Sequence, residues 1–171
     1  KPCRCMGHSS QQQKADTNSI CLNTDTPVNS INALQNVDIV FPILHGPYGE
    51  DGAIQGLLKL LNKPFVGADI LASAICMDKD ISKQLLKANG LPVVDYTVLH
   101  KHQAWEDNIN TIINTLGLPC FVKPANQGSS IGINKATSPA QLITAINTAF
   151  NFDQKVLVEK AICGREIECA V

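Results

Sequence analysis

The sequence lacks a long apolar run, a charged-then-apolar leader and a surplus of either charge. No run approaches the roughly 20 apolar residues that are needed to cross a bilayer. Lysine and arginine together number 14, aspartate and glutamate together 15, and the formal net charge is −1. The basic footprint typical of proteins that bind nucleic acid or anionic membranes is therefore missing. We expect a globular cytoplasmic protein without nucleic acid or a membrane among its partners.

The sequence also lacks the even set of cysteines that a disulfide framework requires. Its seven cysteines mostly lie in apolar runs, which is typical of reduced, buried side chains. Cys3, Cys5 and His8 have side chains that can bind a metal, but no fourth ligand follows at a recognisable spacing. We predict no metal site from these residues.

With 171 residues and 44% hydrophobic content, the sequence is long enough for one or two domains with a proper core. Residues 1–36 are polar and are predicted to be mostly loop. The sequence starts at Lys1 without a strand before this loop, and it stops at Val171 within a predicted strand. We therefore expect that further segments precede and follow it.

The most informative stretch is FVKPANQGSSIG, residues 121–132. An apolar strand ends in Lys123, and a loop with two glycines, two hydroxyls and no acidic residue follows. Such a loop lets backbone N–H groups approach an anion closely, which predicts phosphate binding. The glycine spacing differs from the dinucleotide fingerprint, and the lysine precedes the glycines, unlike in a Walker loop. An ordinary hairpin loop with a surface lysine is the alternative.

Residues 37–44, VDIVFPIL, form a nearly continuous apolar run that is typical of a parallel strand buried on both faces. A turn follows, and Asp51 is placed to cap a helix that begins after it. Ligands of parallel sheets bind beyond the carboxyl ends of the strands, where His45 and Glu50 would lie. The alternatives are a turn histidine bonded to the backbone and acidic residues that only favour the helix dipole.

The following segments alternate between predicted strands and helices. We expect strands at 64–66, 93–99 and 155–159, and helices at 70–76, from Asp78 to Asn89, around 105–116 and around 142–150. Lys79 lies in the first turn of its helix, where a positive charge opposes the dipole and needs a compensating anion. Trp105 and Phe150 are predicted to be core residues.

Residues 165–171 alternate between polar and apolar side chains, which predicts a half-buried strand. The alternation would place Glu166 and Glu168 on one face. These carboxylates could bind sugar hydroxyls or a metal, or they could simply face water.

Four motifs, in this order, resemble those of the D-alanine:D-alanine ligases, ATP-grasp enzymes of peptidoglycan synthesis. They are HGPYGEDG at 45–52, MDK at 77–79, the 121–132 stretch, and VEK at 158–160 with GREIE at 164–168. The resemblance runs from about residue 37 to the end. It implies an α/β fold: residues 1–73 would end a parallel-sheet, flavodoxin-like N-terminal domain, and residues 74–171 would begin an ATP-grasp domain.

The resemblance also implies an activity. In this family, ATP phosphorylates the carboxylate of one D-alanine, and the amine of a second D-alanine attacks the acyl phosphate. The implied cofactors are ATP and Mg²⁺ or Mn²⁺, with metal ligands expected in a C-terminal part that this sequence lacks. D-alanine is the implied substrate, and a homodimer is the implied assembly.

The resemblance assigns roles to individual residues. Lys79 and Lys123 would contact the nucleotide phosphates, under a lid of Gln127, Gly128, Ser129, Ser130 and Gly132. The adenine would be lined by Glu159, Lys160 and Ile162, and the ribose bound by Glu166. The implied catalytic residues are His45, near the first D-alanine, and Ser129 with Glu166, which in this family form a hydrogen-bonded triad with a tyrosine.

The sequence departs from the family in extent. The N-terminal glycine-rich segment and the C-terminal part are not present, so we expect that this chain alone does not turn over. A D-alanine:D-lactate ligase, another ATP-grasp carboxylate–amine ligase and a non-catalytic nucleotide-binding module remain alternatives.

Overall fold

The computed structural model describes residues 31, 32 and 34–167, and the chain divides into two compact units, 1–38 and 39–171. In the first unit, residues 31, 32, 34 and 35 are helical, whereas the sequence predicted mostly loop there. The rest of that prediction, together with Cys3, Cys5 and His8, lies outside the described residues.

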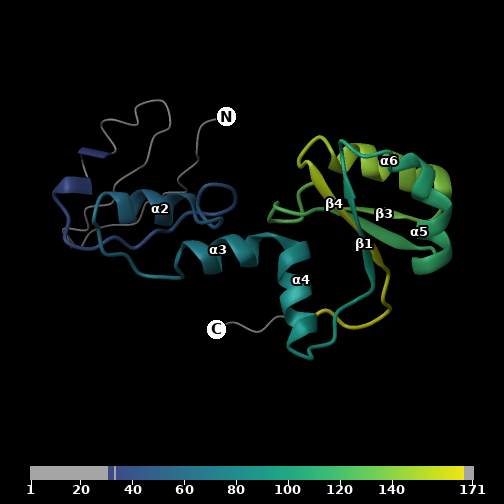
Figure 1. The fold of residues 1–171 in the computed structure, drawn as a ribbon, viewed down its shortest axis with the longest axis horizontal. Helices are drawn as coiled ribbons and strands as arrows, with labels where there is room; N and C mark the ends of the chain where they lie inside the picture. The colour runs from purple at the N-terminus through teal and green to yellow at the C-terminus, as the bar shows by residue number, and fades with distance from the viewer. Residues whose placement is uncertain (1–30, 33, 168–171) are drawn as a thin grey trace, which may run out of the picture. The chain divides into compact units, whose positions relative to one another are not determined.

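The second unit contains a four-stranded sheet (Figure 1). Its order is β1 (Tyr96–His100), β4 (Lys155–Lys160), β2 (Cys120–Pro124) and β3 (Asn134–Ala136), and all neighbouring pairs are antiparallel. The predictions of β1, β2 and β4 are confirmed within a few residues. The short strand β3 was not predicted, because three residues carry too little periodicity to distinguish them from loop.

The two faces of this sheet differ in chemistry because successive side chains of a strand point to opposite faces. One face carries the fully buried Val122, Val156 and Val158, which belong to the hydrophobic core with residues of α5 (Ile109–Leu116) and α6 (Pro139–Ala149). Both helices cover this face in Figure 1. The other face carries the charged side chains of Lys123 on β2 and of Lys155 and Glu159 on β4. We call this side the polar face.

Trp105 and Phe150 are core residues, as predicted. Their side chains are buried, and their ring centroids lie 5.8 Å apart in a tilted arrangement. Trp105 precedes a short 3₁₀ helix, η1 (Glu106–Asn108), that leads into α5. Neither aromatic ring is available to stack on a ligand.

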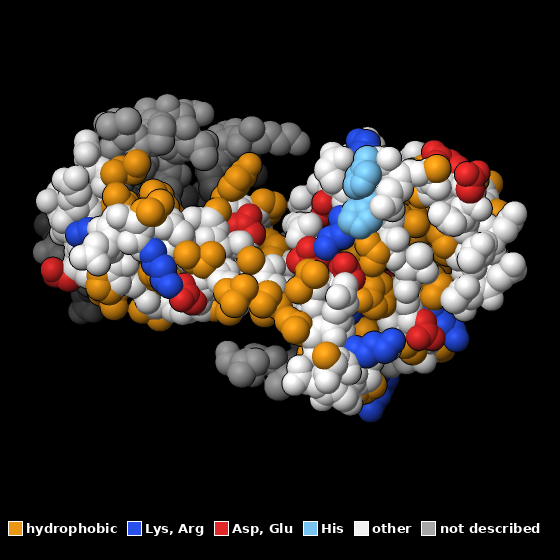
Figure 2. Space-filling view, viewed as in Figure 1, with side chains coloured by type: hydrophobic (Ala, Val, Ile, Leu, Met, Phe, Trp, Pro, Cys, Tyr) orange, Lys and Arg blue, Asp and Glu red, His pale blue; other side chains and the backbone are white. Residues whose placement is uncertain are grey.

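Three further helices are α2 (Ala53–Leu60), α3 (Ile70–Met77) and α4 (Lys79–Ala88). As predicted, Asp78 caps α4, because its carboxylate accepts hydrogen bonds from the N–H groups of Asp80 and Ile81. The Asp51 carboxylate accepts from the N–H of Ala53, although Gly52 occupies the N-cap position of α2. Figure 2 shows apolar side chains gathered on the surface over α3, whose only buried residue is Ser73.

The prediction of a strand buried on both faces is wrong for residues 39–44. The backbone makes a single parallel bridge, between Val40 and Phe65, and Ile39, Phe41 and Ile43 are 60%, 66% and 71% exposed. Burial of both faces needs neighbouring strands and covering helices. In the described part of the unit, no second strand pairs with this segment, so its apolar side chains stay at the surface.

The predicted strand at 165–171 is likewise not formed at residues 165–167, which have no regular structure and are exposed. The remaining residues, including Glu168, lie outside the described part. Within the residues described, no helix is long and apolar enough to cross a membrane.

Candidate functional site

Lys123 and Glu159 form an ion pair on the polar face of the sheet. The Lys123 ammonium lies 2.6 Å from Oε2 of Glu159. Glu159 is only 4% exposed, whereas the Lys123 side chain keeps 28% of its surface open to solvent. A buried carboxylate therefore holds the ammonium of a lysine whose side chain stays partly open to solvent, and hence to an anion.

A second ammonium shares the same carboxylate. Lys83 of α4 lies 3.1 Å from Oε1 of Glu159, and its side chain is 17% exposed. The Lys83 ammonium also lies over the Tyr96 ring, 5.4 Å from its centroid. Glu159 is thus placed between two lysines, one from α4 and one from β2.

Lys79 comes to the same region from the first turn of α4. Its backbone N–H and its ammonium both donate to the carbonyl oxygen of Ala125, and the ammonium also donates to that of Gln127. Burial lowers the pKa of Lys79 below its ordinary value, and the nearby positive charge of Lys123 lowers the same pKa further. The sequence predicted that the charge of Lys79 needs a compensating anion, and the two carbonyl oxygens compensate it in part. The negative charges of Asp153, Glu159 and Asp78 raise the pKa of Lys79 and so oppose the lowering.

The loop after β2 has an unusual backbone. Ser129 and Ser130 have positive φ angles of 48° and 59°, a region that non-glycine residues rarely adopt. Two turns support it, with the N–H of Ile131 bonded to Gly128 and the N–H of Ile133 bonded to Ser130. The tip of the loop, residues 129–131, is exposed. The tip is therefore accessible to a ligand although its turns are internally bonded.

The base of this loop is anchored on the turn before β4. The Asp153 carboxylate accepts from the backbone N–H of Asn126 at 2.7 Å and from its side-chain amide at 3.1 Å. The side-chain amide of Gln127 donates to the carbonyl oxygen of Phe152. The loop therefore has a fixed base and an exposed tip, which is the arrangement that a closing loop needs.

Gly132 closes the loop in a position that only glycine fits. Its φ angle is 73°, and a Cβ atom there would lie 2.8 Å from Phe152 Cδ2 and 2.8 Å from Pro124 Cγ. We expect Gly132→Ala to displace the loop base and to lower the free energy of unfolding by about 1–3 kcal/mol. Urea denaturation measures this change. Gly164→Ala is the control, since a Cβ atom there meets nothing within 4 Å and φ is not in the positive region; an equal loss in both variants would contradict the steric explanation.

A second ion-pair network lies beside the first. The Lys155 ammonium lies 2.6 Å from Asp78 and 3.4 Å from Asp80, and the hydroxyl of Tyr96 donates to Asp80 at 3.1 Å. The two carboxylates raise the pKa of Lys155 against the opposing effect of its burial. Hydrogen bonds from Gln84, Tyr96 and Lys155 lower the pKa of Asp80, although its burial alone would raise it. This network holds the first turn of α4, and hence Lys79, against β4.

The other predicted adenine and ribose residues lie at the end of β4 and beyond it. Lys160 is the exposed last residue of β4, Ile162 is 70% exposed, and Glu166 is exposed and lies outside any element. Within the described range, no hydrogen bond joins Ser129 to Glu166. The structure therefore brings together Lys79, Lys123, Glu159 and the loop, and it does not join Ser129 and Glu166.

His45 and Glu50 lie in one turn, as predicted. The imidazole Nδ1 of His45 lies 3.9 Å from Oε1 of Glu50, and the other carboxylate oxygen accepts from the N–H of Gly46. The His45 side chain is 85% exposed. Its predicted role beside a substrate remains a prediction.

Sequence reasoning missed several residues of the site. Lys79, Lys83 and Lys87 recur every four residues and so share one face of α4, a charged stripe that is usually only solvated. Lys83 was therefore not singled out, and neither were Tyr96, Asp153 and Lys155. The alternation Lys155, Leu157, Glu159 along one apolar strand was a usable signal, because it places two opposite charges on the same face. The partners of these charges lie on β2, on α4 and at the N-cap of α4, and no local pattern reveals them.

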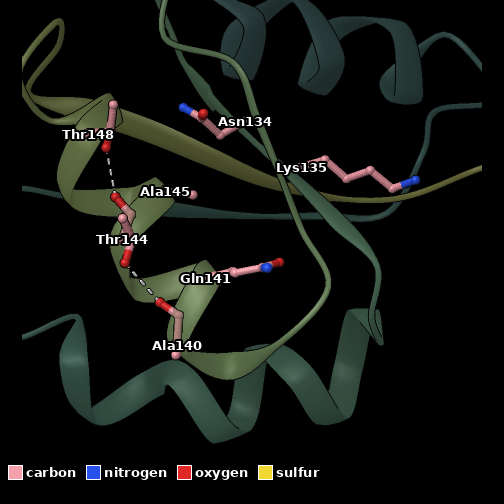
Figure 3. Close-up of a pocket in the computed structure, with 7 residues that line it drawn as sticks. All are labelled: Asn134, Lys135, Ala140, Gln141, Thr144, Ala145 and Thr148. Atoms are coloured by element: carbon pink, nitrogen blue, oxygen red, sulfur yellow. Dashed lines mark hydrogen bonds between the residues drawn. The ribbon is translucent and has the colours of Figure 1, made fainter.

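A surface hollow of about 310 Å³ lies between β3 and α6 (Figure 3). Its lining includes Asn134, Lys135 and Gln141. The Thr144 and Thr148 hydroxyls donate to carbonyl oxygens one turn earlier in α6, at 3.0 and 2.9 Å. The hollow contains none of the predicted site residues.

The cysteines and possible metal ligands give no second site. Cys120 is buried as predicted, but Cys76 and Cys163 are exposed, and all three are free. Among the residues that the structure describes, no group of three histidine, cysteine or acidic side chains is arranged to hold a metal ion. The described residues therefore do not by themselves fit the divalent cation that the sequence resemblance implies.

Comparison with known proteins gives consistent matches. The family profile described as D-ala D-ala ligase C-terminus matches residues 85–171, and that described as D-ala D-ala ligase N-terminus matches residues 4–68. The chain is 54% identical over 138 residues to D-alanine–D-alanine ligase A of Chromobacterium violaceum and 53% identical to that of Escherichia coli K12. Each match covers 81% of this chain but only 38% of the relative.

Solved structures give the same picture. The D-alanine–D-alanine ligase from Coxiella burnetii is 41% identical, with a TM-score of 0.71 over 76% of this chain and 39% of that one. The VanG D-Ala:D-Ser ligase from Enterococcus faecalis is 39% identical, with a TM-score of 0.65 over 75% of this chain and 37% of that one. These proteins share a fold with the described residues but are much longer.

Proposed function

Because this chain belongs to the D-alanine:D-alanine ligase family, we propose that it supplies part of the ATP site of an enzyme that joins two D-alanines for peptidoglycan synthesis. The chain spans about two fifths of the length of its curated relatives. The observation that carries the proposal is the meeting of Lys79 and Lys123 beside one glycine-containing loop. These lysines lie on different elements, and each brings a positive charge to the place where the loop offers backbone N–H groups.

In the proposed reaction, a carboxylate oxygen of the first D-alanine attacks the γ-phosphorus of ATP, and the bond to ADP breaks. The amine of the second D-alanine then attacks the acyl carbon, and phosphate leaves. Negative charge develops on phosphoryl oxygens in the first step and on the acyl oxygen of the tetrahedral intermediate in the second. Fixed ammonium groups and backbone dipoles therefore stabilise the transition states. Lys79 and Lys123 would supply the ammonium groups.

The loop would act as a cover over the phosphates. Its base is fixed by Asp153, and its tip at residues 129–131 is exposed, so the tip can move while the base stays in place. A closed loop would keep water from the acyl phosphate, which hydrolyses when wet. Ser129 and Ser130 lie at the tip, where their N–H groups and hydroxyls can reach phosphate oxygens.

The remaining site residues keep the roles that the resemblance assigns to them, as proposals. Glu159 and Lys160 end β4 and Ile162 lies two residues beyond it, so an adenine there would lie next to the lysines that hold its phosphates. Glu166 would bind the ribose and join Ser129 in a hydrogen-bonded triad, and His45 would lie near the first D-alanine. ATP is proposed to bind as its magnesium complex, with the metal held by ligands other than the residues described.

Location, assembly and second substrate are also proposals. The cytoplasm fits because ATP is supplied there, and a homodimer is the assembly that the resemblance implies. The similarity to a D-Ala:D-Ser ligase makes D-serine an alternative to D-alanine as the second substrate. D-lactate is the alternative that the resemblance itself leaves open.

The experiment that tests the function measures ADP release with magnesium and ATP. This chain is compared with the same chain extended to the full length of its relatives, each with no amino acid, D-alanine, D-serine plus D-alanine, or D-lactate plus D-alanine. We expect release only from the extended chain and only when D-alanine is present. ADP release that does not depend on D-alanine in either chain would refute the ligase assignment. Analysis of the product identifies the second substrate.

A further inference from the structure

The Glu159 carboxylate contacts two ammonium groups, and only one of them has an expected role. We propose that Lys83 is a positioning residue, which holds half of the Glu159 carboxylate so that Lys123 remains free to bind a phosphate. This inference rests on the proposed function, since it concerns the same phosphate site. It assigns a task to a lysine of α4 to which the resemblance gives no role.

Glu159 and its two lysines together carry an excess of positive charge. One carboxylate and two ammonium groups leave a net charge of +1 in a region where Glu159 is 4% exposed. Charges interact more strongly in such a place than in water. With Lys83 present at Oε1, Lys123 pairs with Oε2 at 2.6 Å, and the excess positive charge is available to an incoming anion.

Removal of Lys83 would change this balance. Glu159 and Lys123 would then form a neutral pair, and Oε1, which accepts no hydrogen bond within the described residues, would lose its 3.1 Å ion pair with Lys83. Because an unpartnered buried carboxylate oxygen is costly, Lys123 would be drawn toward both oxygens. An ammonium held in this way is a weaker partner for phosphate.

The surroundings of Lys83 fix its position in advance. The Tyr96 ring lies under its ammonium, and Tyr96 is paired with Glu159 across β1 and β4. The Tyr96 hydroxyl is in turn held by Asp80 on the same helix as Lys83. Lys83 therefore reaches Glu159 through a built contact, whereas a lysine at the surface would sample many directions.

Lys87 provides a matched control. It lies four residues later on α4, in the same stripe of lysines, and its side chain is exposed. Lys87→Gln removes the same charge from the same helix without touching Glu159. A general effect of helix charge would appear equally in both variants.

The test compares equilibrium binding of magnesium–ATP and of adenosine to the chain extended to its relatives' full length. We expect Lys83→Gln to raise the dissociation constant for ATP about tenfold, while that for adenosine changes less than about twofold. Lys83→Arg, which keeps the charge, should restore most of the ATP affinity. Lys87→Gln should leave both constants unchanged.

The outcomes separate three cases. Equal weakening of ATP and adenosine would mean that Lys83 only supports the fold, and it would overturn the proposal. Unchanged ATP binding in Lys83→Gln, or an equal loss in Lys87→Gln, would also overturn it. Because binding is measured without turnover, failure of D-alanine-dependent ADP release in the wild type would refute the proposed function alone.

Discussion

Lys123→Met in the chain extended to full length is expected to lower kcat/KM for ATP by about 10²- to 10³-fold, the loss typical of removing one preorganised electrostatic group. The ammonium is held 2.6 Å from Glu159, and the lysine side chain stays partly open to solvent. It therefore does not need to reorganise when phosphate binds. Steady-state ADP release at varied ATP concentration measures the effect.

The same variant also changes the charge beneath the site. Without Lys123, Glu159 keeps only Lys83, and the pair becomes neutral, so part of the loss arises from the missing net charge. Lys135→Met is the control, because Lys135 lies on the neighbouring strand β3, over the Phe121 ring, and is exposed. If Lys123→Met kept more than about a third of the wild-type kcat/KM, the phosphate role of Lys123 would be wrong.

Lys155→Met is expected to lower the free energy of unfolding by about 2 kcal/mol at neutral pH, somewhat less than the loss for a fully buried pair. The Lys155 side chain is 17% exposed and bonds two carboxylates, those of Asp78 and Asp80. Methionine keeps an apolar side chain of similar length as far as Cε, but it leaves both carboxylates without their cation. Urea denaturation of wild type and variant measures the difference.

This difference should depend on pH in a defined direction. The pKa of Asp80 is lowered from its ordinary value of 3.8, so its contribution is present above that value and is lost as pH falls through the lowered pKa. The pKa of Lys155 is raised from 10.5, so its contribution is present below that value and is lost as pH rises through the raised pKa. The difference between wild type and variant should therefore be flat from about pH 5 to about pH 10 and shrink on both sides.

Lys59→Met is the matched control for this experiment. Lys59 also forms an ion pair, with Asp69, but the two side chains are 50% and 58% exposed. Exposed pairs contribute little because water and salt screen them. A loss of stability in Lys59→Met as large as that in Lys155→Met would contradict the explanation by burial.

The sequence by itself determined the helices and most of the sheet. Asp78 has the side chain and spacing of an N-cap, and Gly90 follows the helix with a φ angle of 76°. The residues next to α4 in the sequence therefore determine where the helix begins and ends. The apolar face of α5 and the run of β4 are equally local signals. The family was also recognisable from the sequence, since each of its motifs is short and they occur in the expected order. The α/β fold with the start of an ATP-grasp domain is confirmed by the comparisons.

The boundary at residue 73 and the roles of the individual site residues stay predictions. The strand predicted at 37–44 with both faces buried and the half-buried strand predicted at 165–171 are not formed at 37–44 and 165–167, and the short strand predicted at 64–66 is reduced to one bridge at Phe65. These failures have a common cause. An apolar or alternating run shows that a segment can be a strand, but burial requires partners. The described chain gives the first segment one parallel bridge, and it gives residues 165–167 no strand partner.

Only the tertiary structure decided which charges meet. Lys83 and Glu159 lie 76 positions apart, as Lys155 and Asp78 lie 77 apart, and no helical or strand period connects such residues. Their contacts arise because α4 lies against the polar face of the sheet. Local sequence fixed the elements through backbone sterics, capping and periodic burial, whereas the long-range pairing of charges followed from how those elements pack.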